Sequence, residues 1–254
     1  MGRVISVANQ KGGVGKTTTA INLGASLAAA ERTVLVVDLD PQANATSGLH
    51  VDPEDVSVSS YEVLIGQSEA RESIVSSELD FLDVLPASRD LAGAEVELVD
   101  ADHREARLRE ALRTVRDEYD FIVIDCPPSL GLLTLNALCA ADAVIVPLQC
   151  EYYALEGLSR LLETIGMLGD ELGHRLEVDG ILLTMYDGRN NLSKQVEREV
   201  RDNFEGRVFE TIISRNVRLS EAPSFGKPAI LYDARSPGAR QYLDFAREYL
   251  EISR

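Results

Sequence analysis

Short apolar runs alternate along this chain with segments whose apolar residues recur at helical spacing. Continuous apolar runs bounded by polar turns predict strands buried on both faces. We expect such strands at residues 4–8, 33–37, 81–86, 121–124, 143–147, 178–185 and 208–213. Helical spacing predicts helices at residues 20–28, 60–65, 103–118, 154–172, 192–204 and 238–251. The helix at 103–118 carries alternating charge, which is typical of a solvated helix.

This alternation predicts an α/β fold with a predominantly parallel twisted sheet and helices on both of its faces. The chain has 254 residues, enough for a large hydrophobic core. We see no repeat, no low-complexity segment and no linker rich in Pro, Gly or Ser. We therefore expect a single domain over residues 1–254.

The turn between the first expected strand and helix has the composition of a phosphate-binding loop. Glycines let the backbone turn several N–H groups toward one point, and the following helix adds its positive N-terminal end. Lys16 supplies a charge for the β- and γ-phosphates, and Thr17 supplies a hydroxyl for Mg²⁺. The alternative is an ordinary glycine turn with a solvated lysine. We expect nucleotide contacts from Lys11, Gly12, Gly13, Val14, Gly15, Lys16, Thr17 and Thr18.

Three aspartates follow expected strands, where open α/β sheets place their binding sites. Asp125 ends one apolar strand and fits the acidic metal-site position of a phosphate-loop NTPase. Asp38 ends another strand and would support the Mg²⁺ shell, so Thr17, Asp38 and Asp125 form the expected metal set. Asp40 could orient an attacking water, although each aspartate could instead be a turn or cap residue. The expected cofactors are ATP and Mg²⁺. The sequence lacks the Asn-Lys-x-Asp segment that guanine specificity would call for, which favours adenine.

Composition limits the possible partners and surroundings. A formal net charge of −17 argues against nucleic acid as a partner. The lysines are few, namely Lys11, Lys16, Lys194 and Lys227, so the acidic surface suggests either a salt-rich cytoplasm or a GC-rich genome. No apolar run is long enough to span a bilayer, and the N-terminus lacks the shape of a signal peptide. Three dispersed cysteines in apolar surroundings predict reduced core residues of a cytosolic protein.

The phosphate loop departs from the general pattern, because Gln10 stands where a glycine is expected and Lys11 follows it. This form resembles the deviant loop of the ParA/MinD family of ATPases. Further stretches resemble ParA proteins of the chromosomal Soj type, and the chain ends without the basic amphipathic helix of MinD. These stretches are residues 38–49, 91–98, 125–131, 149–157 and 215–224.

The resemblance implies a cycle of ATP-driven association. ATP would drive formation of a sandwich homodimer, the dimer would bind double-stranded DNA without sequence preference, and a ParB-like partner would stimulate hydrolysis. In that scheme the catalytic residues are Lys11, which acts across the dimer interface, Lys16 and Asp40. By position, Arg189 and Arg218 would contact DNA phosphates. We expect a cytoplasmic protein that associates with the nucleoid when ATP is bound and has no membrane partner.

Two features leave alternatives open. Ser214 stands where the family usually has proline, in a segment that lines the adenine pocket, so the fit of the base could differ. The acidic charge conflicts with DNA binding, because phosphate contacts weaken steeply with salt. The same ATPase switch could instead position another cargo, such as a chemoreceptor array or a protein compartment. A metabolic enzyme with the same phosphate loop is a third reading, although Cys126 has no paired cysteine for a cluster.

Overall fold

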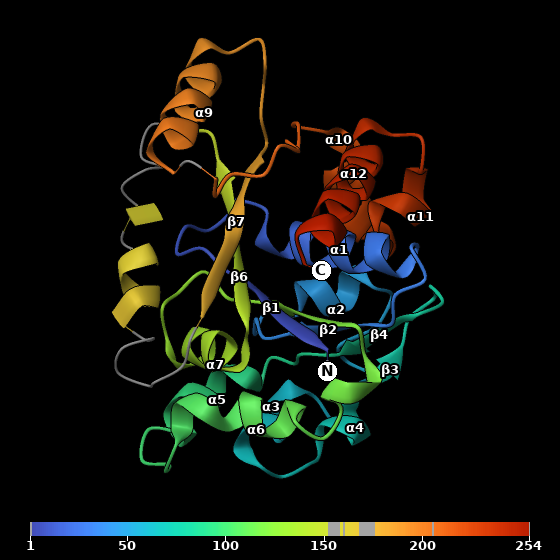
Figure 1. Ribbon diagram of the computed structural model, residues 1–254. Coiled ribbons are helices and arrows are strands. Elements are labelled where there is room, and N and C mark those ends of the chain that lie inside the picture. Colours follow the sequence, from blue (N-terminus) through green and yellow to red (C-terminus); the bar gives the residue numbers. More distant parts are fainter. Residues whose placement is uncertain (1, 152–157, 160, 168–175, 205, 254) are drawn as a thin grey trace.

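The computed structural model describes residues 2–151, 158–159, 161–167, 176–204 and 206–253. Within these ranges a seven-stranded sheet has the order β3-β4-β2-β5-β1-β6-β7 (Figure 1). All neighbouring strands are parallel except β3, which pairs antiparallel with β4 at one edge. The strands are β1 (Arg3–Val7), β2 (Val34–Asp38), β3 (Val75–Ser76), β4 (Leu82–Leu85), β5 (Phe121–Asp125), β6 (Ala143–Gln149) and β7 (Glu177–Thr184). The predicted fold class is confirmed.

The central strands are buried because helices cover both faces of the sheet. Every residue of β2 and β5 is buried, as their unbroken apolar sequence requires. One hydrophobic cluster lies under α1 (Lys16–Ala28) and α12 (Pro237–Ile252). The other lies under a second group of helices, which Figure 1 shows beyond the opposite face. That group consists of α3 (Ser60–Ile65), α5 (Leu91–Glu97), α6 (Arg107–Leu112) and α7 (Leu132–Ala140).

Shorter elements complete the described chain, and no helix in it is long and apolar enough to cross a membrane. Helix α9 stands at the β7 edge of the sheet, whereas α10 and α11 adjoin α12 (Figure 1). The remaining elements are α2 (Asn44–Gly48), α4 (Ala70–Ser73), α9 (Asn191–Asn203), α10 (Val217–Glu221), α11 (Ala229–Asp233), and the 3-10 turns η1 (Arg104–Ala106), η2 (Arg116–Glu118) and η3 (Ala222–Phe225).

Two predicted elements are wrong. The segment 103–118 is not one solvated helix but η1, α6 and η2 in succession, and Leu108 and Leu112 of α6 are buried in the core. The segment 208–213 is not a strand. It meets the sheet edge at isolated bridges, from Val208 to Ile181 and, just beyond it, from Ser214 to Tyr186. The helix predicted at 154–172 falls partly outside the described residues; 158–159 and 161–167 are helical.

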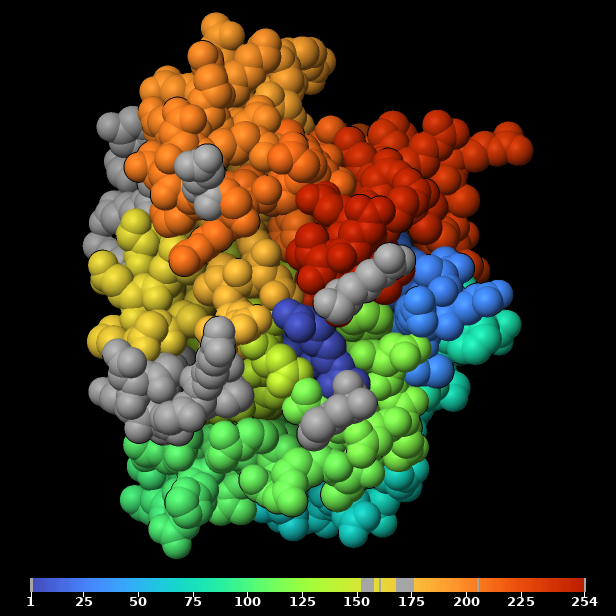
Figure 2. Space-filling model, viewed as in Figure 1, coloured from blue at the N-terminus to red at the C-terminus, as the bar shows by residue number. Residues whose placement is uncertain are grey.

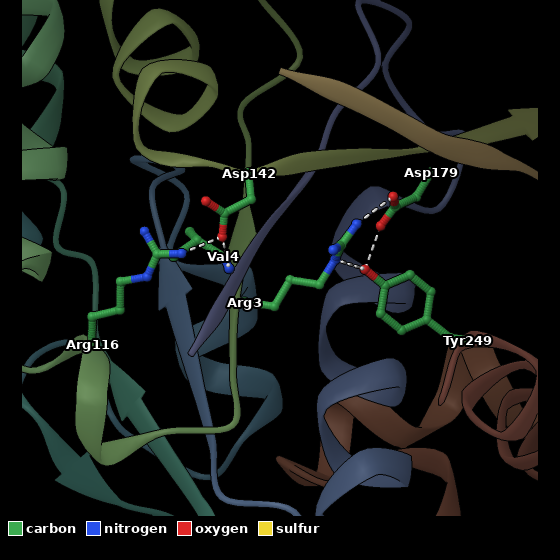
Figure 3. A network of polar contacts seen from close by, with 6 residues as sticks. All are labelled: Arg3, Val4, Arg116, Asp142, Asp179 and Tyr249. Atoms are coloured by element: carbon green, nitrogen blue, oxygen red, sulfur yellow. Dashed lines mark hydrogen bonds and ion pairs between the residues drawn. The ribbon is translucent and has the colours of Figure 1, made fainter. Parts of the chain in front are cut away.

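Polar contacts join residues at the N-terminal ends of the strands, at the end of the sheet opposite the phosphate loop. Arg3 donates to Asp179 of β7 at 2.7 Å and to the Tyr249 hydroxyl of α12 at 3.2 Å, and this hydroxyl also donates to Asp179 (Figure 3). Asp142 accepts hydrogen bonds from the Val4 backbone and from Arg116. The first residues, dark blue in Figure 2, therefore lie between the red C-terminal residues and the green middle of the chain.

Candidate nucleotide-binding site

Strand register brings the two strand-end aspartates together. Asp125, the last residue of β5, lies level with Asp38 of β2 on one side and with Val7 of β1 on the other. Carboxyl ends of parallel strands meet at one edge of a sheet. The phosphate loop starts immediately after Val7, so it begins beside both carboxylates.

The loop has the backbone that its glycines permit. Gly13 and Gly15 have φ values of 74° and 91°, in the left-handed region where a side chain is strained. Gly15 is the N-cap of α1, so the first backbone N–H groups of this helix point into the loop. The Thr184 hydroxyl at the end of β7 donates to the Val14 carbonyl at 2.7 Å. The predicted phosphate loop therefore has the geometry of an anion cradle.

The two loop lysines have different surroundings. Lys16 is buried and its ammonium donates to the Lys11 carbonyl at 3.2 Å, across the loop. Burial lowers the pKa of Lys16, and the nearby Asp125 carboxyl opposes this shift. Lys11 instead extends to the surface, where its ammonium forms an ion pair with Glu151. The Lys16 ammonium thus lies within the phosphate loop of its own chain, whereas the Lys11 side chain points away from that loop to the surface.

Asp125 has the surroundings of a cation-binding carboxylate. It is fully buried, and neither carboxylate oxygen has a hydrogen-bond partner among the residues that the structure describes. Burial raises the pKa of Asp125 well above its usual value, and Asp38 adds to this rise, whereas Thr17 and Lys16 lie close enough to oppose it. A buried carboxylate without donors is costly unless a cation or donor arrives. Asp125 and the Thr17 hydroxyl therefore fit a Mg²⁺ ion.

Asp38 is buried beside Asp125 but its oxygens already accept hydrogen bonds. Oδ1 accepts from the Asp40 backbone at 3.1 Å, and Oδ2 accepts from the Thr46 backbone at 2.8 Å and from the Thr46 hydroxyl at 2.7 Å. Burial raises the pKa of Asp38 to about 6, although the Thr46 donors lower it in part. Asp38 thus fixes the loop that carries Asp40 and adds charge near Asp125.

Asp40 lies on the phosphate side of the loop. A pocket of about 340 Å³ opens here, lined by Gly12, Gly13, Gly15, Lys16, Thr17, Thr18, Asp40, Gln42, Asn44, Pro128 and Met185. Asp40 also makes a turn, because its carboxylate accepts from the Gln42 backbone at 2.9 Å. The turn and the functional position are therefore compatible. No group of three or more His, Cys, Asp or Glu in the described ranges could hold a metal ion.

A second pocket, of about 350 Å³, adjoins the first and shares Gly15, Thr18 and Met185 with it. Its further walls come from Thr184, the segment 213–216, Leu219, Ser220, Pro223 and Tyr242. Sequence reasoning anticipated Ser214 here but missed Thr184, Met185 and Tyr242. Thr184 ends β7, Met185 follows it and Tyr242 lies in α12, and nothing in their local sequence marks a binding role. A phosphate cradle beside a second, more enclosed pocket suits a nucleotide with its base in the second pocket.

The two arginines proposed for DNA are exposed but paired. Arg189, whose side chain is 93% exposed, donates to Asp187 at 3.0 Å. Arg218 pairs with Glu221 at 2.7 Å and with Asp233 at 3.5 Å. Carboxylates next to a surface arginine reduce the positive potential that it offers to phosphates.

Comparison with known proteins gives one family. A family described as an AAA domain matches residues 2–178. The chain is 59% identical to the chromosome partitioning protein ParA of Myxococcus xanthus, over 99% of this chain and 89% of that protein. It is 53% identical to the chromosome-partitioning ATPase Soj of Thermus thermophilus, over 98% and 95% of the two chains.

The fold also matches solved structures. A structure named cobyrinic acid a,c-diamide synthase from Mycobacterium smegmatis, with bound ADP and magnesium, superposes with a TM-score of 0.87 at 42% identity. The match covers 99% of this chain and 95% of that one. The identities to the partitioning proteins are higher. The phosphate loop, the sheet and these relatives together show that the chain belongs to the ParA/Soj family of chromosome-partitioning ATPases.

Proposed function

We propose that this protein is an ATP-dependent switch in chromosome or plasmid partition that hydrolyses ATP to ADP and phosphate and works as one domain. The observation that carries the proposal is the buried Asp125 carboxylate, which has no partner in the described chain and lies beside Thr17 and Lys16. Such a carboxylate below a glycine-rich anion cradle needs a cation that arrives with phosphates.

Each residue of the site has a distinct part in the hydrolysis. The loop N–H groups from Gly12 to Thr18 and the Lys16 ammonium hold the phosphates, and Asp40 orients the attacking water. Thr17 and Asp125 would hold Mg²⁺, with Asp38 in support. When bound, this ion neutralises charge on the β- and γ-phosphate oxygens. Positioning and charge neutralisation therefore account for most of the catalysis.

Lys11 gives the switch its dependence on a second subunit. Its ammonium pairs with Glu151 at the surface, whereas Lys16 serves the loop of its own chain. We infer that Lys11 reaches the phosphates of a partner subunit in an ATP-bound homodimer. The Lys11 ammonium would then stabilise the negative charge on the phosphates in the transition state, as an arginine finger does.

The dimer would bind double-stranded DNA without sequence preference through Arg189 and Arg218, and a ParB-like protein would stimulate hydrolysis. Binding without sequence preference depends on cations gathered on one face of the dimer, because phosphate contacts supply nearly all of the affinity. A cytoplasmic location with nucleoid association in the ATP state follows from this cycle. The similarity to partitioning proteins favours DNA over another cargo.

The test follows the purified protein through the cycle. With Mg²⁺ and ATP we expect phosphate release, a monomer-to-dimer shift in sedimentation and binding of duplex DNA at low salt. With ADP, or with EDTA present, all three should be absent. DNA binding that ignores the nucleotide, or hydrolysis that ignores Mg²⁺, would contradict the proposal.

A further inference from the structure

Ser214 and Gln241 form a two-point contact at the wall of the second pocket. The Ser214 backbone N–H donates to Gln241 Oε1 at 3.0 Å, and Gln241 Nε2 donates to Ser214 Oγ at 2.9 Å. An N–H group can only donate, so the carboxamide orientation is fixed by the pair itself. Residues separated by 27 positions are thus joined, one from the pocket wall and one from the first turns of α12.

The contact adds to backbone hydrogen bonds that hold the same segment on its other side. On the side toward β7, the segment is bonded through the neighbours of Ser214: Tyr186 N–H donates to the Ile213 carbonyl at 3.1 Å, and Arg215 N–H donates to the Tyr186 carbonyl at 3.0 Å. The Ser214 N–H points away from that bridge and is taken by Gln241. Gln241 therefore anchors the other side of the wall.

The anchor is itself rigid. The adjacent Tyr242 is buried, lines the same pocket, and shares a hydrogen bond of 3.1 Å with the Thr19 hydroxyl of α1. Helix α12 starts at a Ser236 cap, whose side chain accepts from the Ala239 backbone. The first turns of α12 are thus fixed to the helix that follows the phosphate loop, and Gln241 transmits this fixed position to residues 213–216.

We propose that Gln241 is a positioning residue that sets the shape of the base pocket through Ser214. The inference rests on the proposed function, because it assigns the base of ATP to this pocket. Gln241 is absent from the pocket lining, whereas Ser214, Arg215 and Asn216 contribute to it. Its loss should therefore reduce affinity for the base and leave the phosphate cradle at Lys16 intact.

Two ligands separate these contributions. Mg²⁺-ADP reports on base and phosphates together, and inorganic tripolyphosphate reports on the cradle alone. Gln241→Ala should weaken ADP binding about three- to tenfold, the effect of one ordinary hydrogen bond or slightly more. Tripolyphosphate affinity should stay within about twofold of the parent protein, a change below the value of one such bond. Gln195→Ala, on the exposed face of α9, is the matched control for the same substitution.

A proline at position 214 gives the decisive arm. Proline has no N–H to leave unpaired and restricts its own φ. In this chain the Ser214 N–H bonds only the Gln241 side chain among the described residues, so Ser214→Pro removes no backbone–backbone hydrogen bond. Ser214→Pro combined with Gln241→Ala should therefore restore ADP affinity to within about twofold of the parent. Ser214→Ala, which keeps the N–H, should cause a smaller loss than Gln241→Ala.

The outcomes are distinguishable from failure of the proposed function. If the parent protein binds neither Mg²⁺-ADP nor Mg²⁺-ATP, the nucleotide site itself is wrong. If the parent binds ADP and Gln241→Ala binds it equally well, the positioning role is wrong. The same conclusion holds if Gln241→Ala weakens tripolyphosphate as much as ADP, or if the proline double variant binds ADP no better than Gln241→Ala.

Discussion

The Lys11 ammonium forms an ion pair with the Glu151 carboxylate of the same chain, outside its own phosphate cradle. Both side chains are partly exposed, 43% and 45% respectively. Such a pair contributes about 0.2–1 kcal/mol. It is weak enough to break when a stronger anion, such as the phosphates bound by a second subunit, becomes available to Lys11.

Neutralising Glu151 should release Lys11 and favour the dimer. We expect Glu151→Gln to tighten ATP-dependent dimerisation by about two- to fivefold, the equivalent of one exposed ion pair. Sedimentation velocity over a range of protein concentrations measures this change. Glu110→Gln, which breaks an exposed pair with Arg113 far from the loop, is the control. Weaker dimerisation in Glu151→Gln would show that the pair supports the active state instead.

Asp40 should act in hydrolysis and not in binding. Asp40→Ala removes the carboxylate that lines the phosphate pocket and should slow turnover by about 10²- to 10⁴-fold, the usual range for a lost acid–base group. ATP affinity should stay near that of the parent, because Lys16 and the loop N–H groups remain. Phosphate release and equilibrium binding are the paired measurements. Asp52→Ala removes another turn-forming carboxylate at the surface and should change neither; normal turnover in Asp40→Ala would remove Asp40 from the mechanism.

We expect the Asp125 carboxylate to lower the stability of the nucleotide-free protein and to contribute to cation binding. Asp125→Asn removes a buried carboxylate that has no partner in the described chain, so the nucleotide-free protein should gain about 1–2 kcal/mol in unfolding free energy. The additional stabilisation by Mg²⁺-ADP over ADP alone should fall. Chemical denaturation with and without ligand measures both effects, and the exposed Asp55→Asn is the control. A destabilised variant with full Mg²⁺ response would contradict this account of the site.

Arg218 should bind DNA in competition with its own carboxylate neighbours. Arg218→Glu should abolish ATP-dependent binding of duplex DNA at low salt, whereas Glu221→Gln should strengthen it by about two- to fivefold, because one competing ion pair is lost. Arg113→Glu makes the same charge change on a remote surface helix end. Fluorescence anisotropy across a salt series is the measurement; equal losses in Arg113→Glu and Arg218→Glu would point to net charge and not to a contact.

The sequence predicted those features that depend on local pattern. Buried strands such as 121–124 read as unbroken apolar runs, and Lys16 and Thr17 follow glycines whose chemistry is specific. The prediction of one solvated helix at 103–118 is wrong because it rests on the alternating charges of the segment. Leu108 and Leu112 lie between these charges and are buried in the core. The Ser214–Gln241 contact joins residues 27 positions apart, and only the tertiary structure reveals it. Likewise, no sequence pattern marks Glu151 as the partner of Lys11.

Lys11 is proposed to complete the site of a second subunit, and sedimentation velocity of Lys11→Ala with a slowly hydrolysed ATP analogue tests this role most directly. Lys227→Ala is the control, since Lys227 is a similarly exposed lysine that pairs with Glu78. We predict that Lys11→Ala binds ATP as the parent does, because Lys16 and the loop remain, yet sediments as a monomer. A Lys11→Ala protein that dimerises and hydrolyses ATP normally would contradict the account.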